Sequence, residues 1–465
     1  MQNNPSCERA SQRIMNSMAS FFRKKPYLVG FILCLTVSAI YFYCAAFITH
    51  NIFAPTNTDY YNYLLDAFFH GRTNITPSNK FDLSLFENKW YVYWGPAPAL
   101  LILPFYLVSH LQASDVLYTV IGGTVNVALF YGVMQAFKKS FQISLSLMAE
   151  AFLLLSFGLA SPNFLLSLAF TVTYTLQIFA TTYLLLFYLF YLRFLKSEKH
   201  WQLILCTVFF CLACLSRYTL VLHGILFVYL FMYDKRSGRA IPTKIILSLA
   251  LIMLAFVSLE ALYNFMRFHD VLETGFRFQQ GATRYHVLQE RFHVLSVRYI
   301  PYNAYYYFIN NIQFSIHNMG IIINTEGNSI FSVYPALLII PVFFRTRKYV
   351  NKKRMSFLLL AGISIGLSLL LLLLYYATGW VQFGNRYFFD VLPLLFLLLM
   401  FILPSVPMFI QMGLLAYGLF VNFYGIMAFY NLPTDNSQLQ ATLFWIVLLT
   451  SLLAFLSMKE GREGT

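Results

Sequence analysis

Charged residues are scarce in this sequence, and acids are the scarcest of them. Only 11% of its 465 residues are charged and 59% are hydrophobic, whereas about 25% of the residues of soluble domains are charged. The 18 Asp and Glu residues are outnumbered by 32 Lys and Arg residues, which leaves a formal net charge of +14. The shortage of charge excludes a soluble globular protein and indicates a polytopic membrane protein.

Cysteine is also rare, and it is absent from the long polar stretches. The six cysteines lie in the N-terminal tail or in apolar runs, which excludes the disulfide framework of a small secreted domain. No repeat of solenoid length occurs. The basic tail, residues 1–26, leads into an apolar run without a small-residue cleavage pattern, so we expect a cytoplasmic tail followed by an uncleaved anchor.

Apolar runs recur along the remaining chain, residues 27–465, which we expect to form one transmembrane domain. A hydrocarbon core of about 30 Å is crossed by roughly 20 helical residues. The runs predict an all-α integral membrane protein with about twelve transmembrane helices. The expected spans are residues 27–49, 116–136, 141–160, 164–192, 202–217, 218–233, 243–266, 328–344, 356–377, 387–404, 407–430 and 441–457.

The run 95–111 is apolar but short, and it contains several prolines, each of which removes a backbone donor. We expect an interfacial or re-entrant helix there. Most of the Lys and Arg residues then fall on the inner side, as the positive-inside rule requires. The long connections 50–94 and 267–327 both lie on the outer face. The positive charge therefore indicates topology and contact with membrane lipids, and no nucleic-acid partner is expected.

Polar residues gather in the first outer loop. It holds several of the few acids and two aromatic stretches, TDYYNYLLDAFFHGR and KWYVYWGPAPALLILPFYL. Two short basic motifs follow at later outer turns, ACLSRYT around Arg217 and FGNRYFFDVLP around Arg386. Ionisable groups at a membrane are costly and usually serve a function, so we expect the chemistry in this loop.

These stretches resemble the GT-C glycosyltransferase superfamily, in particular the group of protein O-mannosyltransferases, aminoarabinose transferases and RgtA/B/C/D-like proteins. In that group an Asp-Glu-x-x-Tyr pattern follows the first span. Asp59 and Tyr63 match its Asp and Tyr, and Tyr60 stands at its Glu. The resemblance implies a transferase that takes a sugar from a polyprenyl-phosphate donor, with Tyr63 in the substrate site.

Transfer from a lipid phosphate needs one base to take the proton of the acceptor hydroxyl. Phosphate is a good leaving group, so the second acid that a glycoside hydrolase uses is not required. Asp59, just beyond the first span, is the expected base. The alternative is a solvated loop acid or a helix-capping acid, because Thr58-Asp59 is also a plausible helix start. Asp66, seven residues on, is expected to assist on the same helical face, with a structural role as its alternative.

The departing phosphate needs positive charge, and guanidinium groups bind phosphate oxygens in pairs. Arg217 and Arg386 are the expected partners, because an Arg near hydrocarbon usually faces a cavity; the alternative is snorkelling to headgroups. Arg284 is a third candidate. It belongs to a series of arginines at 277, 284, 291 and 298 that would follow one helix face, and the alternative is a helix on anionic lipid.

Aromatic and acidic residues complete the expected substrate site. Trp90, Tyr93 and Trp94 are candidates to stack on the sugar or the prenyl chain, although aromatics in membrane proteins more often form interface belts. Glu87 and Asp82 are candidate substrate contacts as well; the alternative for both is an exposed loop acid.

No cofactor is expected. The histidines at 269, 286 and 293 have no carboxylate or Cys at ligand spacing, and the acid that follows Ser161-Pro162 in many members of the GT-C group is absent. A divalent metal stays an unsupported alternative.

The sequence thus predicts an inverting glycosyltransferase of the bacterial inner membrane, with its site facing the periplasm or exterior and a lipid, glycan or protein as acceptor. One alternative is a transporter or flippase of lipid-linked saccharide. Such a protein would more often carry charged residues in the middle of its spans, whereas the only mid-span acids expected here are Glu150 and Glu260. A polysaccharide polymerase or ligase is the other alternative.

Overall fold

The computed structural model describes residues 26–430, apart from gaps at 238–240, 282, 316–319, 323, 325, 348–349 and 380, together with residue 448. Within this part of the chain, seven helices are long and apolar enough to cross a membrane. They are α2 (Pro26–Thr49), α5 (Asp115–Phe141), α6 (Leu147–Leu159) continued by α7 (Pro162–Leu168), α8 (Val172–Ser197), α11 (Thr243–Phe268), α16 (Lys352–Leu374) and α18 (Met408–Phe429). The protein is a helical integral membrane protein, as its composition predicts.

Shorter helices fill the remaining expected spans inside the described residues. The expected tail 1–26 lies almost wholly outside the described residues, and so does the expected span 441–457. The shorter helices are α9 (His200–Ser216), η2 (Tyr218–Ile225) with α10 (Leu226–Ser237), α14 (Ile330–Val333) with η6 (Pro335–Ile339) and α15 (Val342–Thr346), and η8 (Arg386–Asp390) with α17 (Leu392–Leu399) and η9 (Leu403–Ser405).

One expected span, 164–192, is wrong as a single helix. The chain leaves α7 at Leu168 and starts α8 at Val172. A distant group supports this break, since the Thr58 hydroxyl donates to the Phe170 carbonyl at 3.3 Å. The Thr56 hydroxyl lies 3.4 Å from the same carbonyl and donates to Asp115. The expected span 328–344 is likewise interrupted, by Pro335 and Pro341, which cannot donate to a continuing helix.

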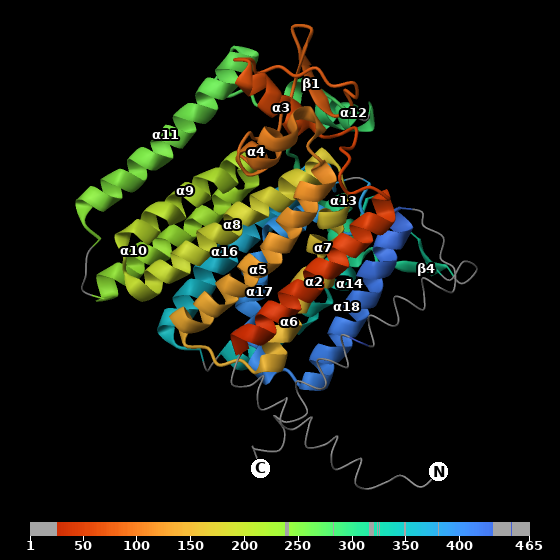
Figure 1. Ribbon diagram of the computed structural model, residues 1–465. Coiled ribbons are helices and arrows are strands. Elements are labelled where there is room, and N and C mark those ends of the chain that lie inside the picture. Colours follow the sequence, from red (N-terminus) through yellow and green to blue (C-terminus); the bar gives the residue numbers. More distant parts are fainter. Residues whose placement is uncertain are drawn as a thin grey trace, which may run out of the picture.

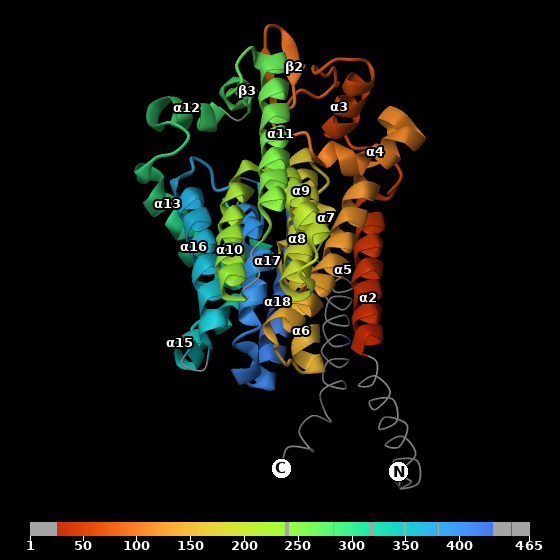
Figure 2. The same cartoon turned by 90° about the vertical axis from the view of Figure 1, so that its left-hand side faces the viewer.

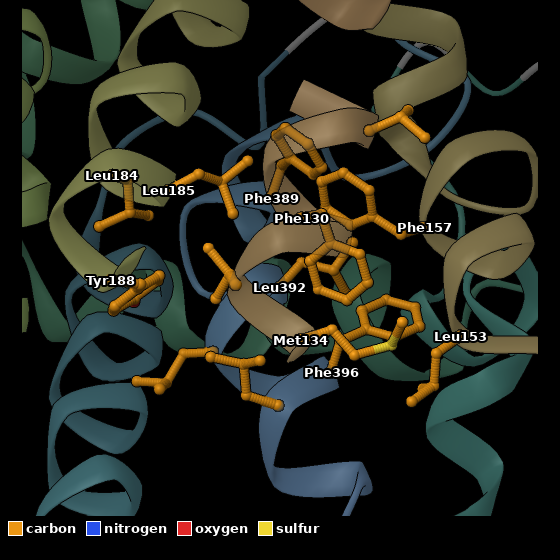
Figure 3. Packing of buried hydrophobic residues seen from close by; sticks show 14 of the residues in the cluster. Phe130, Met134, Leu153, Phe157, Leu184, Leu185, Tyr188, Phe389, Leu392 and Phe396 are labelled. Carbon is orange, nitrogen blue, oxygen red and sulfur yellow. The ribbon is translucent and has the colours of Figure 1, made fainter. Parts of the chain in front are cut away.

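The bundle core lies where α5, α6, α8 and the 386–399 segment meet (Figure 3). The rings of Phe130 and Phe157 stack with centroids 4.3 Å apart, and Phe389 and Phe396 pack against this pair at 5.9 Å and 6.0 Å. All four side chains are fully buried. The core therefore anchors α17, and through it the residues that precede it in η8.

The two long loops meet at one end of the bundle (Figures 1 and 2). The first carries α3 (Tyr60–Phe69), β1 (Leu83–Phe86) and β2 (Lys89–Tyr91), followed by α4 (Pro98–Ser109) and η1 (His110–Gln112). The second carries η3 (Phe276–Phe278), β3 (Gln279–Gln280), α12 (Thr283–Phe292), η4 (Val297–Tyr299), α13 (Ile300–Ala304), η5 (Tyr305–Ile309), β4 (Gln313–Ser315) and β5 (Gly320–Ile322). Helix α4 has 12 residues, about 18 Å at 1.5 Å per residue, which is too short to cross a bilayer.

A small sheet joins the loops, which an all-α expectation did not anticipate. Strands β1 and β2 form a hairpin whose turn residues, Glu87 and Asn88, have φ of 48° and 59°, as a two-residue turn requires. Strand β3 pairs with β1 through Leu83–Gln280 and Ser84–Gln279. The buried Arg267 at the end of α11 adds a second link, since its Nη1 donates to the Val92 carbonyl at 2.5 Å.

The expected helical row of arginines at 277, 284, 291 and 298 is wrong. Only Arg284 and Arg291 belong to α12, while Arg277 lies in η3 and Arg298 in η4. Gly275 at φ 96° precedes η3, and His293 at φ 65° ends α12. Strand β3 separates Arg277 from α12, and the left-handed His293 separates α12 from Arg298, so a seven-residue spacing does not produce one face here.

Candidate active site

A cavity of about 660 Å³ opens where the loop end meets the bundle. Both loops line it, and so do the first turn of α8, the junction of α9 and η2, the last turn of α16 and the segment after it. Four residues expected at the substrate site lie together in its wall: Tyr93, Trp94, Arg217 and Arg386. Because they come from distant parts of the chain, the fold brings them together.

Arg386 is the buried positive charge of this cavity. Its side chain is buried, its Nε donates to the Gly379 carbonyl at 3.1 Å, and its guanidinium lies 5.0 Å and 4.9 Å from the ring centroids of Tyr174 and Tyr387. Among the described residues it forms no ion pair. The charge of Asp82 acts on it from beyond ion-pair distance, and an anion in the cavity would add the direct contact that this buried guanidinium lacks.

Arg217, in contrast, has a partner that sequence reasoning missed. Its Nε lies 2.9 Å from Oδ1 of Asp390, and the Thr219 hydroxyl donates to Oδ2 of Asp390 at 2.7 Å. Gln177 donates through Nε2 to the Arg386 carbonyl at 2.5 Å and to Asp390 Oδ1 at 3.3 Å. The sequence did offer a signal for Asp390, because an acid stands in an apolar run there, four residues after Arg386.

Asp82 is the acid among the cavity-lining residues. The Tyr93 hydroxyl donates to its Oδ1 at 3.1 Å, and Gln279 from the second loop donates to the same oxygen. Burial raises the pKa of the Asp82 carboxyl, while the hydrogen bonds from Gln279 and Tyr93 and the charge of Arg386 act in the opposite direction. Sequence reasoning had ranked this residue below Asp59 and Asp66.

Aromatic rings form much of the wall. The centroids of Tyr93 and Trp94 lie 4.3 Å apart, Tyr60 stacks on Trp94 at 6.3 Å, and Phe276 meets Tyr93 edge-on at 4.7 Å. Tyr375 and Tyr376 line the α16 side. Faces of this kind suit stacking on a sugar ring or packing against an apolar chain.

Asp59, the expected base, is buried but is not one of the lining residues, although Thr58 and Tyr60 are. It is the N-cap residue of α3, but its side chain forms no cap hydrogen bond. Its Oδ2 accepts instead from Asn62 Nδ2 at 3.1 Å, and the same nitrogen donates to the Ala113 carbonyl. Burial, and then the nearby Asp115 charge, raise the pKa of Asp59 to about 6.

This raised pKa predicts a pH-dependent stability. The folded protein holds the Asp59 proton more tightly than the unfolded chain does, so stability falls as pH rises from the ordinary pKa of 3.8 through about 6. Asp59→Asn is a permanently neutral mimic, and we expect it to raise the melting temperature in detergent at about pH 8 but not at about pH 4. Asp270→Asn, at an exposed acid of the second loop, is the control. An equal difference at both pH values would contradict the prediction.

The other expected site residues do not line the cavity. Asp66 pairs with Arg72 at 3.2 Å and accepts from the Tyr106 hydroxyl at 3.2 Å. Glu87 lies in the exposed hairpin turn, 3.5 Å from His269, Trp90 lies in β2 beneath Lys80, and Tyr63 is half-buried in α3. The side chain of Arg284 lies outside what the structure describes. The expected helical face shared by Asp59 and Asp66 therefore does not lead into the cavity.

Within the described part of the chain, no group of three or more His, Cys, Asp or Glu side chains is placed to hold a metal ion. A cofactor-independent reaction stays a prediction of the sequence.

The chain was compared with known proteins by family and by structure. No protein-family model matches it, and no curated protein matches it. It is similar in fold to the oligosaccharyltransferase of Archaeoglobus fulgidus in the apo form, with a TM-score of 0.45 and 13% identity over 91% of this chain and 55% of that chain.

A second similar structure is the archaeal oligosaccharyltransferase AglB from the same organism in complex with an inhibitory peptide and a dolichol-phosphate. Its TM-score is 0.45 and its identity 14%, over 93% of this chain and 56% of that chain. The present chain thus spans about half the length of both. At this level of similarity neither structure assigns a function to it.

Proposed function

We propose that this protein is a membrane glycosyltransferase that moves a sugar from a polyprenyl-phosphate donor to an acceptor hydroxyl, with inversion at the anomeric carbon. The observation that carries the proposal is Arg386, a buried guanidinium in a cavity wall without an ion-pair partner among the described residues. A phosphate would supply the missing negative charge and accept paired hydrogen bonds.

The rest of the wall suits the two other parts of such a donor. Val294, Leu295, Leu371 and Leu372 give the α16 side an apolar surface for a prenyl chain, and Tyr93 and Trp94 offer ring faces to a sugar. Arg217 lies in the same wall, although Asp390 already compensates its charge. It would contribute guanidinium hydrogen bonds to the phosphate.

The charge distribution supports a cavity on the outer face. Basic residues are found at the other end of the bundle, in α15 with Arg345 and at the end of α5 with Lys138 and Lys139 (Figure 2). The positive-inside rule places that end in the cytoplasm. In a bacterium the cavity would then face the periplasm or exterior, where a lipid, glycan or protein could serve as acceptor.

The test is binding and transfer by the purified protein in nanodiscs. A panel of polyprenyl-phosphate sugars is titrated to measure affinity, and transfer is followed with membrane extract as acceptor. We expect at least one donor to bind and to lose its sugar to an acceptor. Binding with movement across proteoliposomes but no transfer would favour a transporter, and binding of no donor would refute the proposal.

A further inference from the structure

Asp82 is held at the cavity by the contact between the two loops. Its backbone N–H donates to the Gln280 carbonyl at 3.0 Å, directly beside the β1–β3 pairing. Its φ is 64°, a left-handed conformation that Asp adopts more readily than most residues but still uncommonly. The position of this carboxylate therefore depends on the docking of the second loop onto the first.

The two carboxylate oxygens of Asp82 are in different situations. Oδ1 accepts from the Tyr93 hydroxyl and from Gln279 Nε2, which are themselves 3.0 Å apart. No described residue donates to Oδ2. One oxygen is thus fixed by the protein, and the other keeps its lone pairs for a group that enters the cavity.

We propose that Asp82, rather than Asp59, is the catalytic base that receives the proton of the acceptor hydroxyl. This inference rests on the proposed function and deepens it. As the acceptor oxygen bonds to the anomeric carbon, its proton passes to Asp82 Oδ2. The bond between that carbon and the phosphate oxygen breaks, and its electron pair stays on the phosphate beside Arg386. Asp82 then releases the proton to water.

The surroundings of Asp82 make its carboxylate more basic than that of an ordinary Asp. The groups that face it are Tyr93 and Gln279 through hydrogen bonds, and Arg386, Tyr60 and Tyr376 through their charge or potential charge. Burial outweighs the opposing contacts, and the pKa of Asp82 lies above its ordinary value. A base is most effective when its pKa approaches the working pH.

Asp59 differs from Asp82 in its position. Its pKa is raised as well, and Asn62 donates to only one of its oxygens, but it is not among the residues that line the cavity. An acceptor bound in the cavity would therefore contact Asp82 and not Asp59. Separate substitutions can therefore tell which aspartate is the base. The proposal predicts that sugar transfer is lost in Asp82→Asn and not in Asp59→Asn alone.

The test compares Asp82→Asn with wild type and with Asp270→Asn, an isosteric change at an exposed acid outside the cavity wall. For each protein, donor affinity and transfer rate are measured in nanodiscs with the donor that wild type uses. We expect Asp82→Asn to bind donor within a few-fold of wild type and to transfer roughly 10²-fold more slowly or worse. Asp270→Asn should match wild type in both.

A second variant protects the test against misfolding. Asp82→Glu keeps the carboxylate and should recover part of the transfer rate. Because a base acts only when deprotonated, the transfer rate of wild type and of Asp82→Glu should rise with pH. The rate of Asp82→Asn should not. Wild-type transfer by Asp82→Asn, or loss of transfer in Asp59→Asn alone, would overturn the assignment. Parallel loss of donor affinity and rate in Asp82→Asn would overturn it as well. If wild type binds no donor, the proposed function itself fails.

Discussion

Arg386→Gln is expected to reduce sugar transfer roughly 10²- to 10³-fold, the usual cost of losing one strong donor to a developing negative charge. The guanidinium is buried in the cavity wall and forms no ion pair with a described residue. The donor phosphate should therefore be its counter-ion. Titration of the donor and measurement of the initial rate should show weaker binding and slower transfer together.

The same substitution should not destabilise the fold. It removes a buried charge without an ion-pair partner among the described residues, but also the hydrogen bond to the Gly379 carbonyl. These effects oppose each other, so we expect the melting temperature of Arg386→Gln to stay close to that of wild type. Arg386→Lys keeps the charge but loses the planar fork, and its transfer rate should be intermediate. Arg193→Gln, at an exposed arginine near the end of α8, is the matched control. Unchanged donor affinity in Arg386→Gln would refute a phosphate role for this residue.

Asp390→Ala, unlike Arg386→Gln, is expected to lower the stability of the fold strongly. It leaves Arg217 half-buried without its carboxylate partner and removes the acceptor for the Thr219 hydroxyl. Breaking a buried pair from one side typically costs about 3–5 kcal/mol, because one charge stays uncompensated. The melting temperature in detergent, or the midpoint of chemical unfolding, should fall clearly below that of wild type.

A double variant distinguishes pairing from simple loss of packing. Arg217→Met with Asp390→Leu removes both charges and should recover much of the stability lost in Asp390→Ala. Glu87→Ala breaks the exposed contact with His269 and should change the melting temperature little. If the double variant is as unstable as Asp390→Ala, the Arg217–Asp390 pair is not the cause.

Local sequence patterns were enough to predict the membrane class and the approximate position of the helices. Hydropathy records burial in lipid directly, since about 20 apolar residues are needed to cross the bilayer. The same patterns could not show the break at Phe170, because the Thr58 hydroxyl that donates to its carbonyl lies more than a hundred residues away in sequence. Nor could they show that the arginine row is divided among separate short elements.

Part of the candidate site could also be predicted, namely the residues whose chemical type is unusual for their position along the chain. An arginine at a membrane boundary or a tryptophan beside an acid-rich loop is unusual in itself, and Arg217, Arg386, Tyr93 and Trp94 all lie in one cavity wall. Which acid faces them was a different question. Sequence ranked Asp59 and Asp66 first, whereas the cavity is lined by Asp82.

The sequence by itself determined that this is a helical membrane protein whose polar residues gather in its loops, because composition and apolar run length act through local burial. Only the tertiary structure decided which residues meet. The Asp82–Gln279 contact joins residues 197 positions apart, and the Arg217–Asp390 pair joins residues 173 positions apart. Such pairs depend on how the loops and helices pack, and no local periodicity encodes that packing.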